Sequence, residues 1–382
     1  MKPTLAIAAT AALGLLAGCA GQVDSQNPPR ELQDIARSTS VNTLWDEQIG
    51  DGMGLGGYTL TPARDGDTLF AADQHGLVMA LDADTGEIRW EHELDNGASS
   101  SLTAVAGGVY LGTRNGEVVA LDQSSGEEVW RSRVSSEVLS APQINSQLVV
   151  VQSVDGNVTA LDRASGSERW VYTSSRPSLT LRTTGTPRII DAVTFAGLAN
   201  GRLVTIENGS GRALWERRIA TPEGRSDIER MVDLVGQPVL TPDGRLYVTS
   251  YNGRLVALQA TSGQVLWSRD VPSYHTPVLV DDTLYVVDDD SHLVALSASN
   301  GEQRWRLDDL AGRQLTAPAF ADGRLVVGDF EGYLHVIDAE NGTLVGRTEI
   351  DGSGISARPL TDGNRVYAMA DDGSLEALEL NP

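Results

Sequence analysis

The stretch "ALDADTGEIRW", from Ala80 to Trp90, decides the fold because the chain repeats it. Four close copies end at later tryptophans: "ALDQSSGEEVW" at Trp130, "ALDRASGSERW" at Trp170, "ALQATSGQVLW" at Trp267 and "ALSASNGEQRW" at Trp305. Aligned on Gly-x-x-x-Trp, the motif places tryptophans at positions 45, 90, 130, 170, 215, 267 and 305, and an eighth copy carries Gly346 instead. A unit that recurs at such a spacing is typical of repeat architectures.

Each copy of the motif follows a short strand such as "GEVVALD" at Gly116, and a further apolar run such as "QLVVVQS" precedes that strand. Runs of about five residues rich in Val and Leu, bounded by Gly and Asp, indicate strands and not helices. The residues after an 18-residue leader give about 45 residues for each of eight units, the size of a four-stranded propeller blade. The sequence therefore predicts an all-β chain, an eight-bladed β-propeller of four-stranded antiparallel blades.

The two ends of the array are uneven. Trp45 has no preceding "ALD" strand, and the last strand, "SLEALEL", has no following Trp strand. We therefore predict that the N-terminal strand, residues 43–49, completes the last blade, because this closes the ring and leaves no open sheet edge there. Asp and Gly of the motif form the turn before the outermost strand, and the indole covers the seam to the next blade. The motif is thus interpreted as structural.

Charge and cysteine content limit the function. With 29 Lys and Arg against 52 Asp and Glu, the formal charge is −23, which argues against nucleic-acid binding because phosphates require a basic surface. Cys19 is the single cysteine and has no disulfide partner. The five histidines show no helical pairing, so no metal site and no cofactor are expected.

The N-terminus predicts export. Lys2 is followed by an apolar stretch, residues 5–16, which is too short to span a bilayer. Leu16-Ala17-Gly18-Cys19 resembles the lipobox of bacterial lipoproteins, which implies cleavage before Cys19 and lipidation of its thiol. An ordinary secretory signal is the alternative. We expect residues 1–18 to be the signal peptide, 19–40 a lipidated tether and 41–382 the propeller. Ala20 and Gly21 lack the Asp of inner-membrane retention, so the resemblance favours the outer membrane, facing the periplasm.

Two connections depart from the repeat. The spacing from the motif tryptophan to the proline that opens the next blade is 12 residues from Trp130 to Pro142, but 17 from Trp170 to Pro187 and 23 from Trp215 to Pro238. These two long connections precede neighbouring blades and should lie side by side. They read "SSRPSLTLRTTGTP" and "ATPEGRSDIERMVDLVGQP", in which apolar residues alternate with charges such as Arg230. This pattern favours a recognition surface, with a stabilising cap as the alternative. The spacing of 17 after Trp45 is attributed to its glycines.

The lipobox, the eight-unit array, "SLTLR" and "DIERMVDLVGQP" together resemble the BamB family, propeller lipoproteins of the outer-membrane β-barrel assembly machinery. The resemblance covers essentially the whole chain and implies a non-catalytic scaffold. It implies contact with the BamA insertase through its periplasmic POTRA domains and with other subunits of the complex. By position in the motifs, the contact residues are Leu179, Leu181, Arg182 and Asp233, and Val235 replaces a second family Asp. Presentation of strand edges to unfolded barrel clients is a further hypothesis.

The Trp repeat also resembles that of pyrroloquinoline quinone-dependent alcohol dehydrogenases. Those enzymes are larger and use adjacent cysteines, a calcium site and a catalytic Asp. This chain has no adjacent cysteines and lacks the insertions that would build a cofactor cavity. A quinoprotein dehydrogenase and a different periplasmic scaffold, such as a peptidoglycan-associated propeller, remain as alternatives, but we expect the chain not to be an enzyme.

Overall fold

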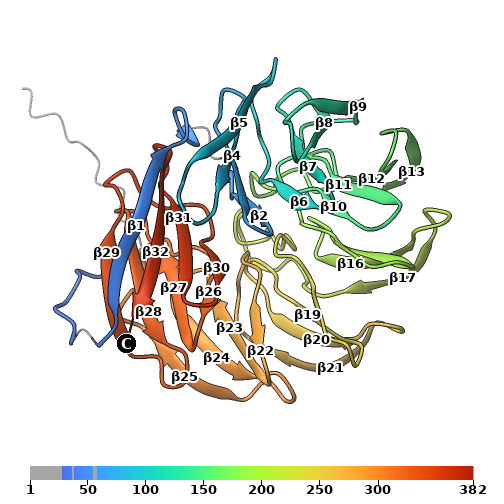
Figure 1. The fold of residues 1–382 in the computed structure, drawn as a ribbon. Helices are drawn as coiled ribbons and strands as arrows, with labels where there is room; N and C mark the ends of the chain where they lie inside the picture. The colour runs from blue at the N-terminus through green and yellow to red at the C-terminus, as the bar shows by residue number, and fades with distance from the viewer. Residues whose placement is uncertain (1–27, 37, 55–57, 382) are drawn as a thin grey trace, which may run out of the picture.

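The computed structural model describes residues 28–36, 38–54 and 58–381, and these residues form eight four-stranded antiparallel sheets (Figure 1). The sheets fan around a common axis in chain order, as the colours of the ribbon show. The first strands of several neighbouring sheets contact one another around that axis: β2 with β6, β6 with β10, β10 with β14, and β26 with β30. The predicted fold class, an eight-bladed β-propeller, is confirmed. Among the described residues, no helix has the length and apolar character needed to cross a membrane.

Each blade runs outward from a short inner strand. Blades 1 to 4 comprise β2 (Ala63–Asp65), β3 (Thr68–Ala72), β4 (Leu77–Asp82) and β5 (Ile88–Glu93); β6 (Thr103–Val105), β7 (Gly108–Gly112), β8 (Glu117–Asp122) and β9 (Glu128–Arg133); β10 (Gln143–Ile144), β11 (Leu148–Gln152), β12 (Asn157–Asp162) and β13 (Glu168–Thr173); β14 (Arg188–Ile189), β15 (Val193–Gly197), β16 (Arg202–Glu207) and β17 (Ala213–Arg218).

Blades 5 to 8 repeat the arrangement, with one strand of the last blade taken from the N-terminal part of the chain. They comprise β18 (Val239–Leu240), β19 (Arg245–Val248), β20 (Leu255–Gln259) and β21 (Gln264–Arg269); β22 (Val278–Val280), β23 (Thr283–Val287), β24 (Leu293–Ser297) and β25 (Gln303–Leu307); β26 (Ala319–Ala321), β27 (Arg324–Gly328), β28 (Tyr333–Asp338) and β29 (Leu344–Glu349); β30 (Leu360–Asp362), β31 (Arg365–Met369), β32 (Ser374–Asn381) and β1 (Ser40–Gln48).

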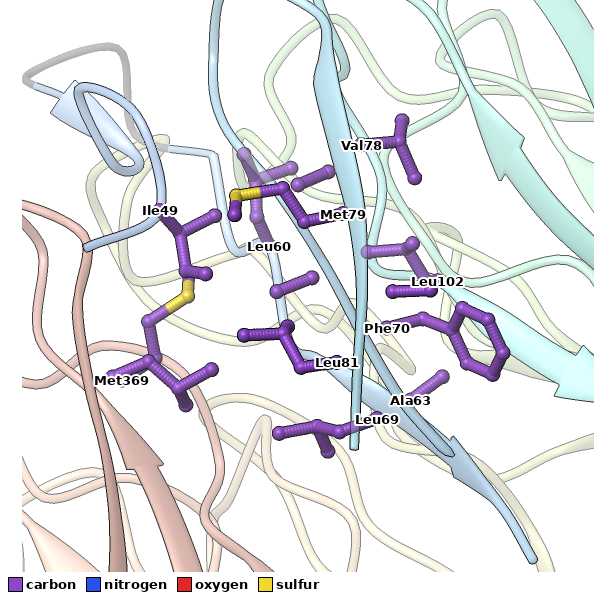
Figure 2. Packing of buried hydrophobic residues seen from close by; sticks show 14 of the residues in the cluster. Ile49, Leu60, Ala63, Leu69, Phe70, Val78, Met79, Leu81, Leu102 and Met369 are labelled. Atoms are coloured by element: carbon purple, nitrogen blue, oxygen red, sulfur yellow. The ribbon is translucent and has the colours of Figure 1, made fainter. Parts of the chain in front are cut away.

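The ring closes as predicted. β1 pairs antiparallel with β32, from Ser40 opposite Asn381 to Gln48 opposite Ser374, and the two strands lie side by side in Figure 1. Behind this closure, Ile49 and Met369 pack with Leu69 and Leu81 of blade 1 in one buried cluster (Figure 2). The second and third strands of the blades are almost wholly buried, because each lies between two neighbouring sheets.

The motif tryptophans join each blade to the next. Each of the seven indole N–H groups donates to a main-chain carbonyl of the following blade at 2.7 to 3.1 Å: those of Ala83, Gln123, Arg163, Asn208, Ala260, Ala298 and Ala339. The indole ring also covers the motif glycine of the following blade. A Cβ on Gly126, where φ is +72°, would lie 2.6 Å from the Trp90 ring. The glycine therefore serves both the turn and the close approach of the indole.

The eighth copy lacks a tryptophan because the seam from blade 7 to blade 8 is built differently. In blade 8 no hairpin turn joins β32 to β1, so there is no motif glycine for an indole to cover. The main-chain N–H groups of Ser38 and Thr39 instead donate to Val345 O at 3.0 Å, beside Gly346. A Cβ at Gly346 would lie 3.0 Å from Thr39 O. The N-terminal segment thus takes the place of the indole.

The predicted tether, residues 19–40, is described only in part, and the signal peptide and Cys19 lie outside the described residues. Residues 28–36 form no helix and contact blade 7. Arg30 N–H donates to Ala311 O at 2.9 Å, and Arg313 Nη1 donates to Arg30 O at 3.0 Å. Leu32 and Ile35 pack against the core between blades 6 and 7. This part of the chain is therefore held against the propeller.

Candidate functional site

The two long connections form one surface, which we call the docking ledge: residues 174–187 between β13 and β14, and residues 219–238 between β17 and β18. Three hydrogen bonds join them, one of them from Gln237 Nε2 to Pro187 O at 2.9 Å. Leu181 N–H donates to Asp233 Oδ1 at 3.2 Å, and Thr186 N–H donates to Val235 O at 3.1 Å. Both connections enter neighbouring blades on the same side, so the predicted adjacency of the two segments is present in the structure.

The apolar residues of the first connection lie at the surface. Leu179 is 42% exposed, and Leu181 is half-buried beside it. Their place on the ledge is fixed through the main chain, because the Leu181 amide is bound by the Asp233 carboxylate. An exposed leucine held in a fixed position is suited to packing against another protein.

Asp233 lies beneath the ledge and not on it. Only 3% of the residue is exposed, and its main-chain carbonyl accepts a 3.0 Å hydrogen bond from Tyr251 N–H. Burial raises the pKa of Asp233 to about 6, against the opposing effect of the bond from Leu181 N–H. Asp233 Oδ2 is buried without a hydrogen-bond partner among the described residues. In this arrangement Asp233 positions Leu181, while a direct contact with a partner stays a prediction.

Arg182 is exposed and is held by an aromatic ring from another blade. Its Nη2 donates to Tyr58 OH at 3.3 Å, and its Cζ lies 5.3 Å from the centroid of the Tyr58 ring. Tyr58 belongs to the connection between Trp45 and Pro62. Sequence reasoning set this third long connection aside because of its glycines, and so missed Tyr58. The signal available was an aromatic residue within an over-long spacing.

The second connection has a buried base and an exposed tip. Val232 and Leu234 are buried, whereas residues 221–230 are all exposed, including Ile228 at 61%. At the tip, Arg230 forms an ion pair with Asp227. Because the tip covers none of the propeller core, the alternative of a stabilising cap applies only to the base. The exposed tip adds Arg230 and Ile228 to the surface that a partner would meet.

Val235 contributes no charge to the ledge. Its side chain is half-buried and its carbonyl accepts the Thr186 amide. The position at which the family resemblance implies a second acid is therefore neutral here. The charged groups that the ledge exposes are four arginines and three acidic residues: Arg176, Arg182, Arg225, Arg230, Glu223, Asp227 and Glu229.

The acidic side chains of the repeat motif have a structural role. No group of three or more His, Cys, Asp or Glu side chains that could hold a metal ion occurs among the described residues. The Asp of the motif is used for turns: Asp82 Oδ1 accepts the amides of Asp84 and Thr85 at 2.9 Å. The ledge exposes a leucine, an isoleucine and several arginine side chains. Its main chain is held in place by the buried Asp233 carboxylate. These features are suited to binding a protein.

Comparisons with known proteins agree with this description. The family model for "Outer membrane protein assembly factor BamB" matches residues 34–115, 97–307 and 290–381. The chain is 46% identical to the Pseudomonas aeruginosa outer membrane protein assembly factor BamB, over 97% of each protein. It is 32% identical to the Escherichia coli protein of the same name, over 91% of each.

Solved structures show the same fold. BamB from Moraxella catarrhalis superposes with a TM-score of 0.81 at 24% identity, covering 89% of this chain and all of that one. A europium-containing methanol dehydrogenase superposes with a TM-score of 0.73 but at only 14% identity, covering 88% of this chain and 84% of that one. The similarity to the dehydrogenase is one of fold alone, since long relatives at 32% to 46% identity are assembly factors. This chain belongs to the BamB family of outer membrane protein assembly factors.

Proposed function

We propose that this chain is a non-catalytic scaffold of outer-membrane β-barrel protein assembly, which binds the periplasmic POTRA domains of a BamA-type insertase through the docking ledge. The observation that carries the proposal is the bond from Leu181 N–H to Asp233 Oδ1, which fixes two exposed segments as one surface. Leu179 supplies an apolar anchor, and Arg182 supplies a charged one. A few buried anchors carry most of the affinity of protein interfaces.

The test is binding of the purified full chain to the insertase's periplasmic domains, measured by biolayer interferometry. We expect Leu179→Ala, Arg182→Ala and Asp233→Ala each to weaken binding by about tenfold or more. The matched control is Val129→Ala, because Val129 is 58% exposed on the outer strand β9, away from the ledge. Unchanged affinity in all three ledge variants would contradict the proposal, and an insertase that never binds would favour a different periplasmic scaffold.

The proposed location is the inner leaflet of the outer membrane, through lipidation of Cys19. The support is the lipobox order Leu16-Ala17-Gly18-Cys19. Metabolic labelling with radioactive palmitate tests this proposal. We expect label in the wild-type chain and none in Cys19→Ala, and a labelled Cys19→Ala chain would refute the assignment.

A second candidate role is direct contact with unfolded barrel clients by strand addition. It is favoured by the outermost strands, which carry exposed apolar residues: Ile88, Val129, Val171, Leu214, Val265 and Leu266. Each such strand has only one neighbour in its sheet, and an open edge of this kind can pair with an extended chain. Site-specific photocrosslinking from position 214 during barrel assembly tests the idea, and the absence of any client adduct would remove it.

A further inference from the structure

The ring of Tyr58 contacts two guanidinium groups that come from different blades. Arg182 of the ledge lies 5.3 Å from the ring centroid, measured at Cζ, and Arg114 lies 4.5 Å from it. Arg114 follows β7 in blade 2, and Tyr58 precedes β2 in blade 1. The ring therefore connects the ledge of blades 4 and 5 with the loops of blades 1 and 2. Cation–π contacts of this kind fix the position of an arginine.

The two arginines have no carboxylate partner among the described residues. Arg182 donates to the Tyr58 hydroxyl, and Arg114 Nη2 donates at 3.4 Å to the amide oxygen of Gln74. Some arginines of the chain differ in this respect, since Arg89 and Arg131 each bind two carboxylates. Arg114 Nε is also buried without a hydrogen-bond partner in the described part of the chain.

Two like charges held by one ring repel each other, and an anion between them would relieve this repulsion. Although the chain carries a net charge of −23, this pair of cations has no carboxylate at ion-pair distance among the described residues. Arginine binds carboxylate with two parallel hydrogen bonds, so a protein partner would meet this site with Asp or Glu. The half-burial of Tyr58 and Arg114 means that the geometry is fixed before binding.

We propose that Arg114, Tyr58 and Arg182 form a carboxylate clamp, which extends the docking ledge onto blades 1 and 2 and takes an acidic side chain of the docked protein. This inference rests on the proposed function, and it adds the chemistry that the partner must present. In the clamp, Arg114 and Arg182 bind the carboxylate, and Tyr58 is a positioning residue that holds both.

The test uses the purified full chain and the periplasmic domains of the BamA-type insertase, in a series of salt concentrations. We expect Arg114→Gln, which keeps a hydrogen-bonding group near Gln74, to weaken binding by about tenfold at low salt. The dependence of affinity on salt should also become shallower, as expected when a charge contact is lost. Arg114→Lys retains the charge but not the two parallel hydrogen bonds, so its affinity should lie between those of wild type and Arg114→Gln.

Tyr58→Leu should weaken binding although Tyr58 itself carries no charge, and Tyr58→Phe should weaken it less because the ring remains. The matched control is Arg218→Ala, which removes the same charge from an exposed position on β17. If Arg182→Ala weakens binding while Arg114→Gln and Tyr58→Leu do not, the clamp is refuted and the proposed function stands. If the ledge variants leave binding unchanged as well, the proposed function fails with it. Equal melting temperatures of the variants establish that each loss reflects binding and not folding.

Discussion

The main-chain amide of Leu181 donates a 3.2 Å hydrogen bond to Asp233 Oδ1, across 52 residues of sequence. This bond makes one surface out of two connections that belong to different blades. It also places a carboxylate in a buried position, where burial raises the pKa of Asp233 to about 6. Both consequences can be measured.

The first prediction concerns stability and pH. Because the pKa of Asp233 is raised in the folded chain, the neutral carboxyl stabilises the fold below pH 4, and this contribution is lost as the pH rises through 6. Asp233→Asn keeps a neutral group at every pH. At pH 7.5 we expect the free energy of unfolding to exceed that of wild type by up to about 3 kcal/mol, and the difference to vanish below pH 4.

Urea unfolding of both chains from pH 3.5 to 8 measures this difference. The control is Thr221→Ala, an exposed change in the same connection that involves no titratable group. A difference between Asp233→Asn and wild type that does not change with pH would show that ionisation of Asp233 is not its cause.

The second prediction separates positioning from contact. Asparagine at position 233 retains an oxygen that can accept the Leu181 amide, whereas alanine does not. We expect Asp233→Asn to bind the insertase within about threefold of wild type, and Asp233→Ala to lose about tenfold. Interferometry at pH 7.5 gives both affinities. Equal losses in the two variants would mean that the charge of Asp233 itself meets the partner.

The third prediction concerns the motif tryptophans. Trp170 is 8% exposed, and its indole N–H donates to Asn208 O at 2.7 Å. In Trp170→Phe this carbonyl loses its donor and the seam loses part of a ring, so we expect a loss of about 1–3 kcal/mol in unfolding free energy. The neighbouring Val171→Ala, at a position 41% exposed, should change stability by less than about 0.5 kcal/mol. Chemical denaturation followed by circular dichroism compares the two, and equal losses would count against the role of the seam.

The fourth prediction concerns ring closure. Deleting residues 41–49 removes most of β1 and leaves an unpaired edge on β32. We expect the whole propeller to lose its single cooperative unfolding transition, because blades 1 and 8 no longer share the core of Ile49 and Met369. Calorimetry measures the transition. Deleting residues 221–230, which are all exposed, removes a similar length and should leave the transition intact. A chain without β1 that unfolds as cooperatively as wild type would disprove closure by this strand.

The fifth prediction concerns buried charges in blade 7. Asp329 is fully buried and accepts hydrogen bonds from Arg313 Nε at 2.7 Å and from His335 Nε2 at 2.8 Å. Asp329→Asn leaves Arg313 with only the half-exposed carboxylate of Glu331 as a counter-charge, and we expect a loss of about 2–4 kcal/mol. Asp270→Asn breaks the exposed pair with Arg254 and should cost at most about 1 kcal/mol. Thermal unfolding ranks the two, and similar losses would argue against a buried network.

Local sequence determined the architecture. The spacing of the tryptophans and glycines fixes eight units, because each motif makes its own hairpin turn and its own contact with the next blade. The missing strand before Trp45 and the missing Trp strand after the last repeat indicated the closure by β1, and the two long spacings indicated the ledge. These features depend on residues that are close together in the chain, or on the number of motif copies and the number of residues between them.

Only the tertiary structure decided which atoms meet across blades. An aspartate in a long polar connection is expected at the surface, yet Asp233 is buried together with its neighbours Val232 and Leu234. Tyr58 reaches Arg182 over 124 residues, and a contact at that separation leaves no local pattern. The replacement of an indole by Thr39 at Gly346 likewise depends on closure of the ring. Turns and strand periodicity depend on residues that are close in sequence, so the sequence alone predicts them. Long-range contacts form only when the eight blades have closed into the propeller, so only the tertiary structure reveals them.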